Sequence, residues 1–254
     1  MIVCVGLATR DTIYALPHHP EPDERVVATR RVVTGGGPAA TAAVAIARLG
    51  VAVRFVGVLD DELDGVEVVR MPGRMVESTI LVAADTRAIV TEEAEAFFVA
   101  PDVLKDADWV HVDHVGYAAV RDLVPGGDEV PRLSVDGGNP VPDLDLEHVA
   151  LYAPTAATDD GRRGKLTVVT RGADGCTAYT ADGETIDAPG LPVDVVSTLG
   201  AGDVFHGALL ACLARGLPLR EALVHANACA ALSCRALDGR SAIPTWEELE
   251  RAVA

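Results

Sequence analysis

Short apolar segments recur along the chain, and stretches with helical or polar patterns separate them. The apolar segments are 2–7, 53–58, 109–112, 133–135, 150–153 and 167–170. Continuous short apolar runs are typical of strands buried on both faces of a parallel sheet. Because helical patterns such as the alanine-rich stretch 39–49, ended by Gly50, lie between them, the sequence predicts an α/β fold with a doubly wound, mainly parallel sheet.

Composition limits the classes of protein to be considered. With 254 residues, of which 49% are apolar and 23% charged, the chain can bury one sizeable core. The 21 basic and 38 acidic residues give a net charge of −17, which disfavours nucleic acid and anionic membranes as partners. We find no membrane span or signal peptide and expect a cytoplasmic protein.

The cysteines are odd in number, lie in apolar stretches and form no C-x-x-C motif, so we expect buried thiols without disulfides or zinc. They are Cys4, Cys176, Cys212, Cys229 and Cys234.

A glycine-rich motif, Ser197-Thr198-Leu199-Gly200-Ala201-Gly202-Asp203, precedes the helical pattern at 204–215. Small residues let a ligand approach the backbone, and the first N–H groups and the dipole of a helix favour an anion. The motif therefore predicts a phosphate site with a carboxylate beside it. The alternative is an ordinary helix cap, in which Asp203 only satisfies the first turn.

Segment 196–211, together with Gly36-Gly37, resembles the ribokinase-like (PfkB) carbohydrate kinases, whose signature is Asp-Thr-x-Gly-Ala-Gly-Asp. The likeness extends to Val5-Gly6 with Asp11, to 168–175 and to 239–244. The Gly-Asp-Val-Phe-His-Gly form around His206 is nearest to members acting on ketohexoses and their sulfonated relatives, such as sulfofructose. Simple packing of His206 is the alternative.

The resemblance implies a ribokinase-like core of residues 1–10, 34–66 and 100–254, and a small β-sheet lid of residues 11–33 and 67–99. It implies phosphorylation of a hydroxyl on a small sugar, ketohexose-like or pentose, with ATP and Mg²⁺ as cofactors. It allows a monovalent cation such as K⁺. Lid sheets of this family often pair between chains, so a homodimer is expected.

The resemblance also assigns the site. Asp203 is the expected general base, ionised at neutral pH by its helix N-terminus, and the amides of Gly200, Ala201 and Gly202 hold the transferring phosphoryl group. The expected sugar-binding residues are Asp11, Gly36, Gly37 and Thr41, the last in the usual position of an asparagine. The expected nucleotide-binding residues are Thr170, Gly172, Gly175, Thr198 and Asn227. For Asp11 the alternative is a turn cap. For the glycines it is simple turn geometry, and for Asn227 it is a position on the helix surface.

Two departures from the family pattern concern the metal. Ser197 replaces the first Asp of the signature, and Thr155 and Thr158 fall where relatives carry an Asn-x-x-Glu that helps to hold magnesium through water. A hydroxyl adds no negative charge. No metal-binding residue is therefore assigned, and we expect an active enzyme that needs more magnesium.

Two other functions remain open. Gly35-x-Gly37-x-x-Ala40, with Asp60 or Asp61 about 20 residues on, is a weak dinucleotide-binding pattern of an oxidoreductase. Ser197, Thr155 and Thr158 are also compatible with a sugar- or nucleotide-binding protein without turnover. A P-loop is excluded, because Gly164-Lys165 precedes Leu166.

Other polar side chains have a simpler interpretation. His111 and Asp113, followed by His114, lack a further ligand at metal-site spacing, so we interpret them as a satisfied strand end. Arg10, Arg74 and Arg87 could meet an acidic substrate group, but solvated surface charge is the favoured interpretation.

Two connections are short for an α/β fold. Only about nine residues separate the strand at 53–58 from the next β segment, whereas a parallel crossover with a helix needs about a dozen or more. The linker 154–166 is similarly lean. Relatives carry a helix at both places, so either the chain is pared down or stretches of the natural chain are absent, and we favour absence.

Overall fold

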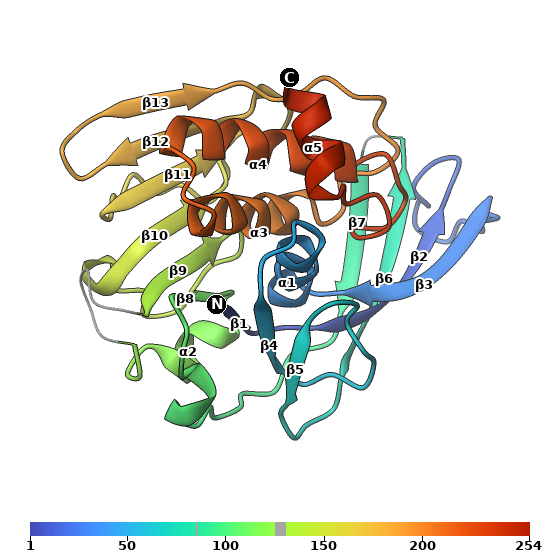
Figure 1. Ribbon diagram of the computed structural model, residues 1–254. Helices are drawn as coiled ribbons and strands as arrows, with labels where there is room; N and C mark the ends of the chain where they lie inside the picture. Colours follow the sequence, from blue (N-terminus) through green and yellow to red (C-terminus); the bar gives the residue numbers. More distant parts are fainter. Residues whose placement is uncertain (85, 125–130) are drawn as a thin grey trace.

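The computed structural model describes residues 1–84, 86–124 and 131–254. Residue 85 of the expected lid and residues 125–130 of the expected core lie outside the described residues. Within the described chain there are two sheets, and the larger has nine strands in the order β13-β12-β11-β10-β9-β8-β1-β4-β5 (Figure 1). Their bounds are β1 (Ile2–Val5), β4 (Val53–Gly57), β5 (Glu67–Arg70), β8 (Trp109–Val112), β9 (Arg132–Gly137), β10 (Val149–Pro154), β11 (Leu166–Thr170), β12 (Cys176–Thr180) and β13 (Thr185–Ala188). Pairing is parallel from β11 to β5 and antiparallel at β12 and β13, which confirms the α/β prediction.

Side-chain alternation along β1 divides the core into two layers. Ile2 and Cys4 face the layer that contains most helices, whereas Val3 and Val5 face the opposite layer. The first layer holds α1 (Pro38–Arg48), α3 (Ala201–Ala214), α4 (Leu219–Ser233) and α5 (Trp246–Val253). The second holds α2 (Gly116–Val120), the 3₁₀ helix η1 (Pro101–Leu104) and the extended residues before it. The helices expected at 39–49 and 204–215 are thus present as α1 and α3.

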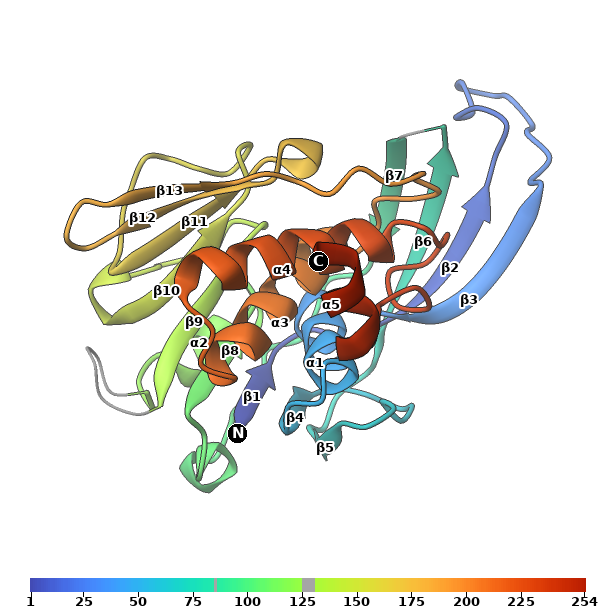
Figure 2. The same cartoon turned by 45° about the horizontal axis from the view of Figure 1, so that its top comes forward.

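The smaller sheet stands to one side of the core (Figure 2). Its order is β3-β2-β6-β7, with bounds β2 (Thr9–Ala15), β3 (Arg30–Gly36), β6 (Val76–Ala83) and β7 (Thr86–Thr91). Ile13, Ile80 and Val82 on one face pack with Leu237, and Leu199 of the glycine-rich motif packs against them. The sheet therefore touches the loop that leads into α3.

The expected lid range 67–99 is divided between the two sheets. Its first strand, β5, pairs with β4 at the edge of the larger sheet, and only β6 and β7 belong to the smaller one. An edge strand leaves part of its side chains in water, and β5 is partly exposed throughout. For this reason its sequence resembles that of an exposed sheet.

The two short connections are short in the structure as well. Residues 58–66 join β4 to the parallel strand β5, and residues 155–165 join β10 to the parallel strand β11, without a helix in either described segment. The interpretation that natural residues are absent here stays a prediction.

The cysteines are buried and free, as expected. Among the described residues, no helix has both the length and the apolar character that a membrane span requires.

Candidate active site

The carboxyl ends of β1, β8 and β9 meet the first turns of α1 and α3, and Asp113 ties this edge together. Its Oδ2 accepts the N–H of Leu7 (2.7 Å) and Ala39 (3.3 Å), and its Oδ1 accepts those of Val115 and Gly116 (both 2.9 Å). Asp113 is therefore a satisfied strand end, as the sequence indicates. Among the described residues, no three His, Cys, Asp or Glu side chains form a group that could hold a metal ion.

Asp11 and the glycine pair before α1 are in direct contact. A Cβ on Gly36 would lie 2.0 Å from Asp11 Oδ2, and one on Gly37, which has φ 91°, would lie 2.4 Å from Leu7 O. Thr9 Oγ1 donates to Asp11 Oδ1 (2.6 Å). Burial raises the pKa of Asp11, which the hydrogen bond from Thr9 and the charge of Arg240 oppose. Asp11 and Gly36 thus lie against one another, and the backbone at Gly36 and Gly37 is packed too closely for a side chain; we call Asp11, Gly36, Gly37 and Thr41 the acceptor wall.

Arg240 completes this wall, and the sequence did not single it out. Its Nη2 donates to Gly36 O (2.6 Å) and its Nε donates to Thr41 Oγ1 (3.1 Å). Burial lowers its pKa to about 10, against the attraction of Asp11, Asp203 and Asp238. Arg240 is therefore protonated at neutral pH and lies within electrostatic range of both site carboxylates. Its place directly after Gly239, inside a segment that matches the family, is the signal that could have found it.

The start of α3 is open toward the site. Gly200 is the N-cap with φ 73°, and no side chain caps the helix, so the alternative that Asp203 is only a cap is not supported. A Cβ on Gly202 would meet no atom within 4 Å. Ala201 N–H donates to Thr198 O (3.3 Å), a long bond. The first turn of α3 is therefore open at Gly202.

Asp203 differs from expectation in its charge. Burial, followed by the negative charge of Asp136, raises its pKa to about 7, whereas His206 favours the ionised form. The carboxyl is thus about half protonated at neutral pH, rather than fully ionised. The helix N-terminus does favour the anion, but desolvation and neighbouring carboxylates outweigh it.

The two residues at the beginning of the motif are hydrogen-bonded. Ser197 is buried, and its Oγ accepts the N–H of Leu199 (3.2 Å). Thr198 Oγ1 accepts from Arg87 Nη1 (2.8 Å), which extends from β7. Thr198, an expected nucleotide ligand, therefore contacts the smaller sheet.

The expected nucleotide-binding residues Thr170, Gly172 and Gly175 lie at a turn between two strands, whereas the sequence pattern predicts a turn from a strand into a helix. Residues 171–175, with a 3₁₀ turn η3 (Gly172–Asp174), connect β11 to the antiparallel β12. Gly172 has open space beside it, but a Cβ on Gly175 would lie 2.2 Å from Ala188 O. Asn227 Nδ2 donates to Ala188 O (3.0 Å) and Pro189 O (3.1 Å). Gly175 and Asn227 thus both contact the backbone at 188–189, whereas Thr170 lies at the end of β11.

Comparison with known proteins settles the family. Residues 1–69 and 148–246 match the pfkB family of carbohydrate kinases. The chain belongs to this family. Membership makes it a sugar kinase that uses ATP.

Relatives and solved structures agree with this assignment. The chain is 26% identical to a ribokinase of Bacillus subtilis, over all of this chain and 99% of that protein. It is 44% identical to a probable fructokinase-6 of Arabidopsis thaliana over 35% of this chain, and that match spans only 25% of the plant protein. The structure resembles a Cryptococcus neoformans ribokinase solved with ADP (TM-score 0.81, 20% identity, 98% of each chain) and an Arabidopsis thaliana ribokinase complexed with ribose and ATP (TM-score 0.77, 19% identity, 99% of this chain and 98% of that one). These two structures establish the fold.

The B. subtilis alignment extends over 294 positions, more than the 254 residues of this kinase. The relative therefore has segments that this chain lacks, in keeping with short internal connections.

The oxidoreductase alternative is not supported, because β3 before Gly37 lies in the exposed smaller sheet. The acidic residues of that dinucleotide-binding pattern, Asp60 and Asp61, form ion pairs with Arg10, whose Nη2 is 4.0 Å and 3.6 Å from their Oδ2 atoms.

In this kinase, Thr155 and Thr158 satisfy one another. Their Oγ1 atoms are 3.0 Å apart, and Thr158 Oγ1 donates to Gly137 O (2.6 Å). Both hydroxyls are thus used to close a turn.

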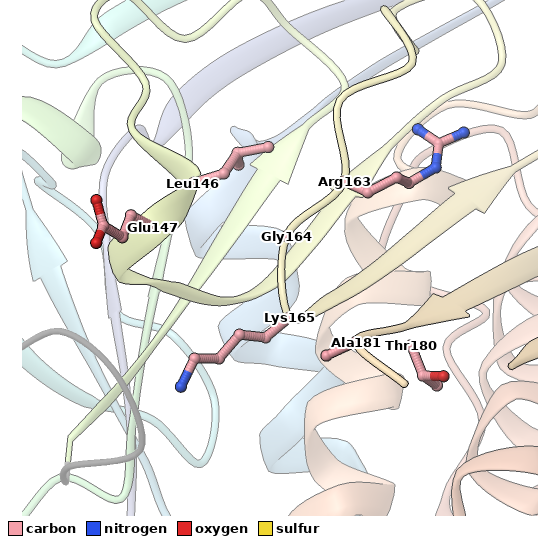
Figure 3. Close-up of a pocket in the computed structure, with 7 residues that line it drawn as sticks. All are labelled: Leu146, Glu147, Arg163, Gly164, Lys165, Thr180 and Ala181. Carbon is pink, nitrogen blue, oxygen red and sulfur yellow. The ribbon is translucent and has the colours of Figure 1, made fainter. Parts of the chain in front are cut away.

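A hollow on the kinase surface lies away from these residues. Figure 3 shows its lining side chains, which are Leu146, Glu147, Arg163, Gly164, Lys165, Thr180 and Ala181. Residues 146–147 precede β10 and residues 163–165 precede β11, so the hollow lies at the amino ends of the parallel strands. Ligands of open α/β sheets bind at the carboxyl ends, where α3 begins.

Proposed function

We propose that this kinase transfers the γ-phosphoryl group of ATP to a primary hydroxyl of a small sugar or sugar derivative, ketohexose-like or pentose. Asp11, Gly36, Gly37 and Thr41 hold the acceptor beneath the smaller sheet. The nucleotide lies along Thr170, Gly172, Gly175 and Thr198, toward the segment held by Asn227.

The transfer forms a bond between the acceptor oxygen and the γ-phosphorus and breaks the bond to the β,γ-bridging oxygen, so that ADP leaves. The acceptor proton passes to the carboxylate of Asp203. The amides of Gly200, Ala201 and Gly202 stabilise the charge on the phosphoryl oxygens, which is the larger electrostatic contribution.

The observation that carries this proposal is the position of Arg240. One buried guanidinium donates to Gly36 O and Thr41 Oγ1 on the acceptor side and is attracted by both Asp11 and Asp203. It therefore links the acceptor wall to the base. Such an arrangement can hold a hydroxyl-rich molecule next to a carboxylate that takes a proton.

An acceptor screen tests the proposal. Purified protein is mixed with ATP, Mg²⁺ and single acceptors, namely fructose, ribose, a sulfonated ketohexose and nucleosides, and ADP release and the phosphorylated sugar are measured. We expect turnover with one class and at least about 10²-fold less with Asp203→Asn. Asp194→Asn, an exposed change on the segment before the motif, is the matched control.

Binding of ATP and a sugar by calorimetry, with no ADP release for any acceptor, would support a binding protein without turnover. Equal activity of the Asp203→Asn variant would reject Asp203 as the base.

Magnesium is expected to enter with ATP. The described residues offer no ready-made metal-binding group, and Mg²⁺ is usually held in such sites by substrate phosphates and waters. No step is assigned to a protein-bound metal.

We further propose a homodimer through the smaller sheet in the cytoplasm. The outer strand β7 is exposed along its whole length, with Ile89 at 48% and Val90 at 69% exposure, and an unpaired sheet edge favours pairing. Light scattering of the wild type and of Val90→Lys tests this, and a monomeric wild type would reject it.

A further inference from the structure

Asp136 and His206 form a buried ion pair next to Asp203. Asp136 lies on β9 and His206 on α3, three residues after Asp203. His206 Nδ1 is 3.1 Å from Asp136 Oδ2, with both side chains at most 5% exposed. Residues three apart share a face of a helix, so the base and the histidine are neighbours on α3.

The groups around this pair define its electrostatics. His111, on β8, has its ring centre 5.8 Å from that of His206 and its Nδ1 3.1 Å from Ser134 Oγ. Burial lowers the pKa of His111 to about 3, so it is neutral. Tyr152, on β10 beside Asp136, has a raised pKa because of burial and is neutral too. Asp203 additionally experiences Asp113 after β8 and Arg240 after α4.

Each member of the pair favours the charged form of the other. Burial alone would lower the pKa of His206, but Asp136 and Asp203 outweigh it, and the pKa is raised. Burial alone would raise the pKa of Asp136, but His206 outweighs it, and the pKa is lowered. The charges of Asp136 and His206 thus offset one another, which is favourable because an unpaired buried charge is strongly destabilising.

We propose that Asp136 and His206 are positioning residues: their buried ion pair joins β9 to α3 beside Asp203 and sets the pH range in which Asp203 accepts the acceptor's proton. The proposal rests on the proposed function, because it takes Asp203 as the base. It follows that the two partners act in opposite directions. Asp136 opposes the ionisation of Asp203, whereas His206 favours it.

The pH dependence of kcat/KM separates these effects. Asp136→Asn removes the stronger of the two influences on Asp203 but keeps an oxygen that can accept the N–H of Gly138, now bonded at 2.7 Å, so the midpoint of the acid limb should fall even though His206 becomes neutral more readily. His206→Asn removes the cation, and the midpoint should rise by about one pH unit. His111→Asn alters a buried but neutral neighbour, and the midpoint should stay in place.

A purely structural role would lower the melting temperature or kcat without moving the midpoints in opposite directions, and that result would overturn the proposal. Equal shifts in the three variants would overturn it as well.

A second readout does not depend on turnover. In the ¹⁵N NMR spectrum of the histidine-labelled wild type, His206 should remain an imidazolium at pH values above the ordinary histidine pKa. In the Asp136→Asn variant, His206 should lose its proton at a lower pH than in the wild type. A His206 that titrates at or below its ordinary pKa overturns the proposal. A wild type that phosphorylates no acceptor, with His206 still protonated, instead rejects the proposed function.

Discussion

Arg87 on β7 donates from Nη1 to Thr198 Oγ1 at 2.8 Å. This hydrogen bond joins the outermost strand of the smaller sheet to the loop that precedes Gly200. The small sheet and the expected phosphate site are therefore connected by a polar contact as well as by the packing of Leu199. A change in the conformation of the smaller sheet should therefore alter the loop before Gly200.

Removing this contact should weaken substrate binding. An exposed hydrogen bond to a charged group contributes a modest binding free energy, so we expect Arg87→Ala to raise the KM of acceptor or ATP by about fivefold. Thr198→Val should have a similar effect, and the double variant should be no worse than either single one. Arg74→Ala is the control, because Arg74, just before β6, pairs with Glu92, just after β7, and not with the loop. Additive losses would show that the two residues act independently.

Asp203→Asn should remove turnover while leaving nucleotide binding intact. Only the proton acceptor is lost, so kcat should fall at least about 10²-fold. Calorimetry with ATP should give an affinity close to that of the wild type. Weaker ATP binding of the same size as the loss in kcat would point to a binding role instead.

The pKa of Asp203, raised to about 7, predicts an acid limb in kcat/KM. Activity should fall about tenfold per pH unit well below pH 7, because only the ionised carboxylate accepts a proton. A flat profile between pH 5 and 7 would contradict the assignment.

The same shift has a consequence for stability. A folded-state pKa above the unfolded value favours folding at low pH, and that contribution is lost as pH rises toward about 7. Asp203→Asn should therefore raise the melting temperature at pH 8 relative to wild type, with a smaller gain at pH 5. Calorimetric scans at both pH values measure this, and a gain independent of pH would have another cause.

Arg240→Ala should chiefly impair the acceptor side. It removes the donors to Gly36 O and Thr41 Oγ1 and the cation near Asp11, so we expect the acceptor KM to rise about tenfold or more and the melting temperature to fall. Arg240→Lys keeps the charge but cannot reproduce both contacts, and should be intermediate. A larger effect on the KM of ATP than on that of the acceptor would contradict this role.

Ser197→Asp should lower the magnesium concentration needed for half-maximal rate, because it restores a negative charge at the first position of the signature. The present Oγ accepts the N–H of Leu199, and a carboxylate can accept the same bond. Ser197→Ala, which loses this bond without adding charge, is the control. An unchanged magnesium requirement would reject the explanation.

The order of elements and the position of the start of α3 could be predicted from local sequence. A few adjacent residues are enough to indicate the helix start at Gly200-Ala201-Gly202. The same holds for the short apolar runs that form β1 and β8. The sheet to which β5 belongs could not be predicted, because an edge strand of the core and a strand of an exposed sheet have similar patterns of apolar and polar residues.

The parts of the site that sequence reasoning missed depend on distant contacts. The sequence points to His206 beside the base, but Asp136 lies 70 positions before it in the printed sequence, and no local pattern shows that the two meet. The full ionisation expected for Asp203 failed for the same reason. Desolvation and the charge of Asp136 arise only when the sheet and α3 pack together.

Asp113 has a consequence for the order in which the protein can form during synthesis. Its carboxylate holds the N–H groups of Leu7 and Ala39, which emerge from the ribosome long before it. The turn after β1 and the start of α1 therefore lack their shared acceptor until β8 has been made. The acceptor wall at Gly36 and Gly37 should become rigid only at that stage, and Arg240 reaches it later still. A nascent chain stopped after α1 should accordingly leave these amides rapidly exchanging with solvent deuterium.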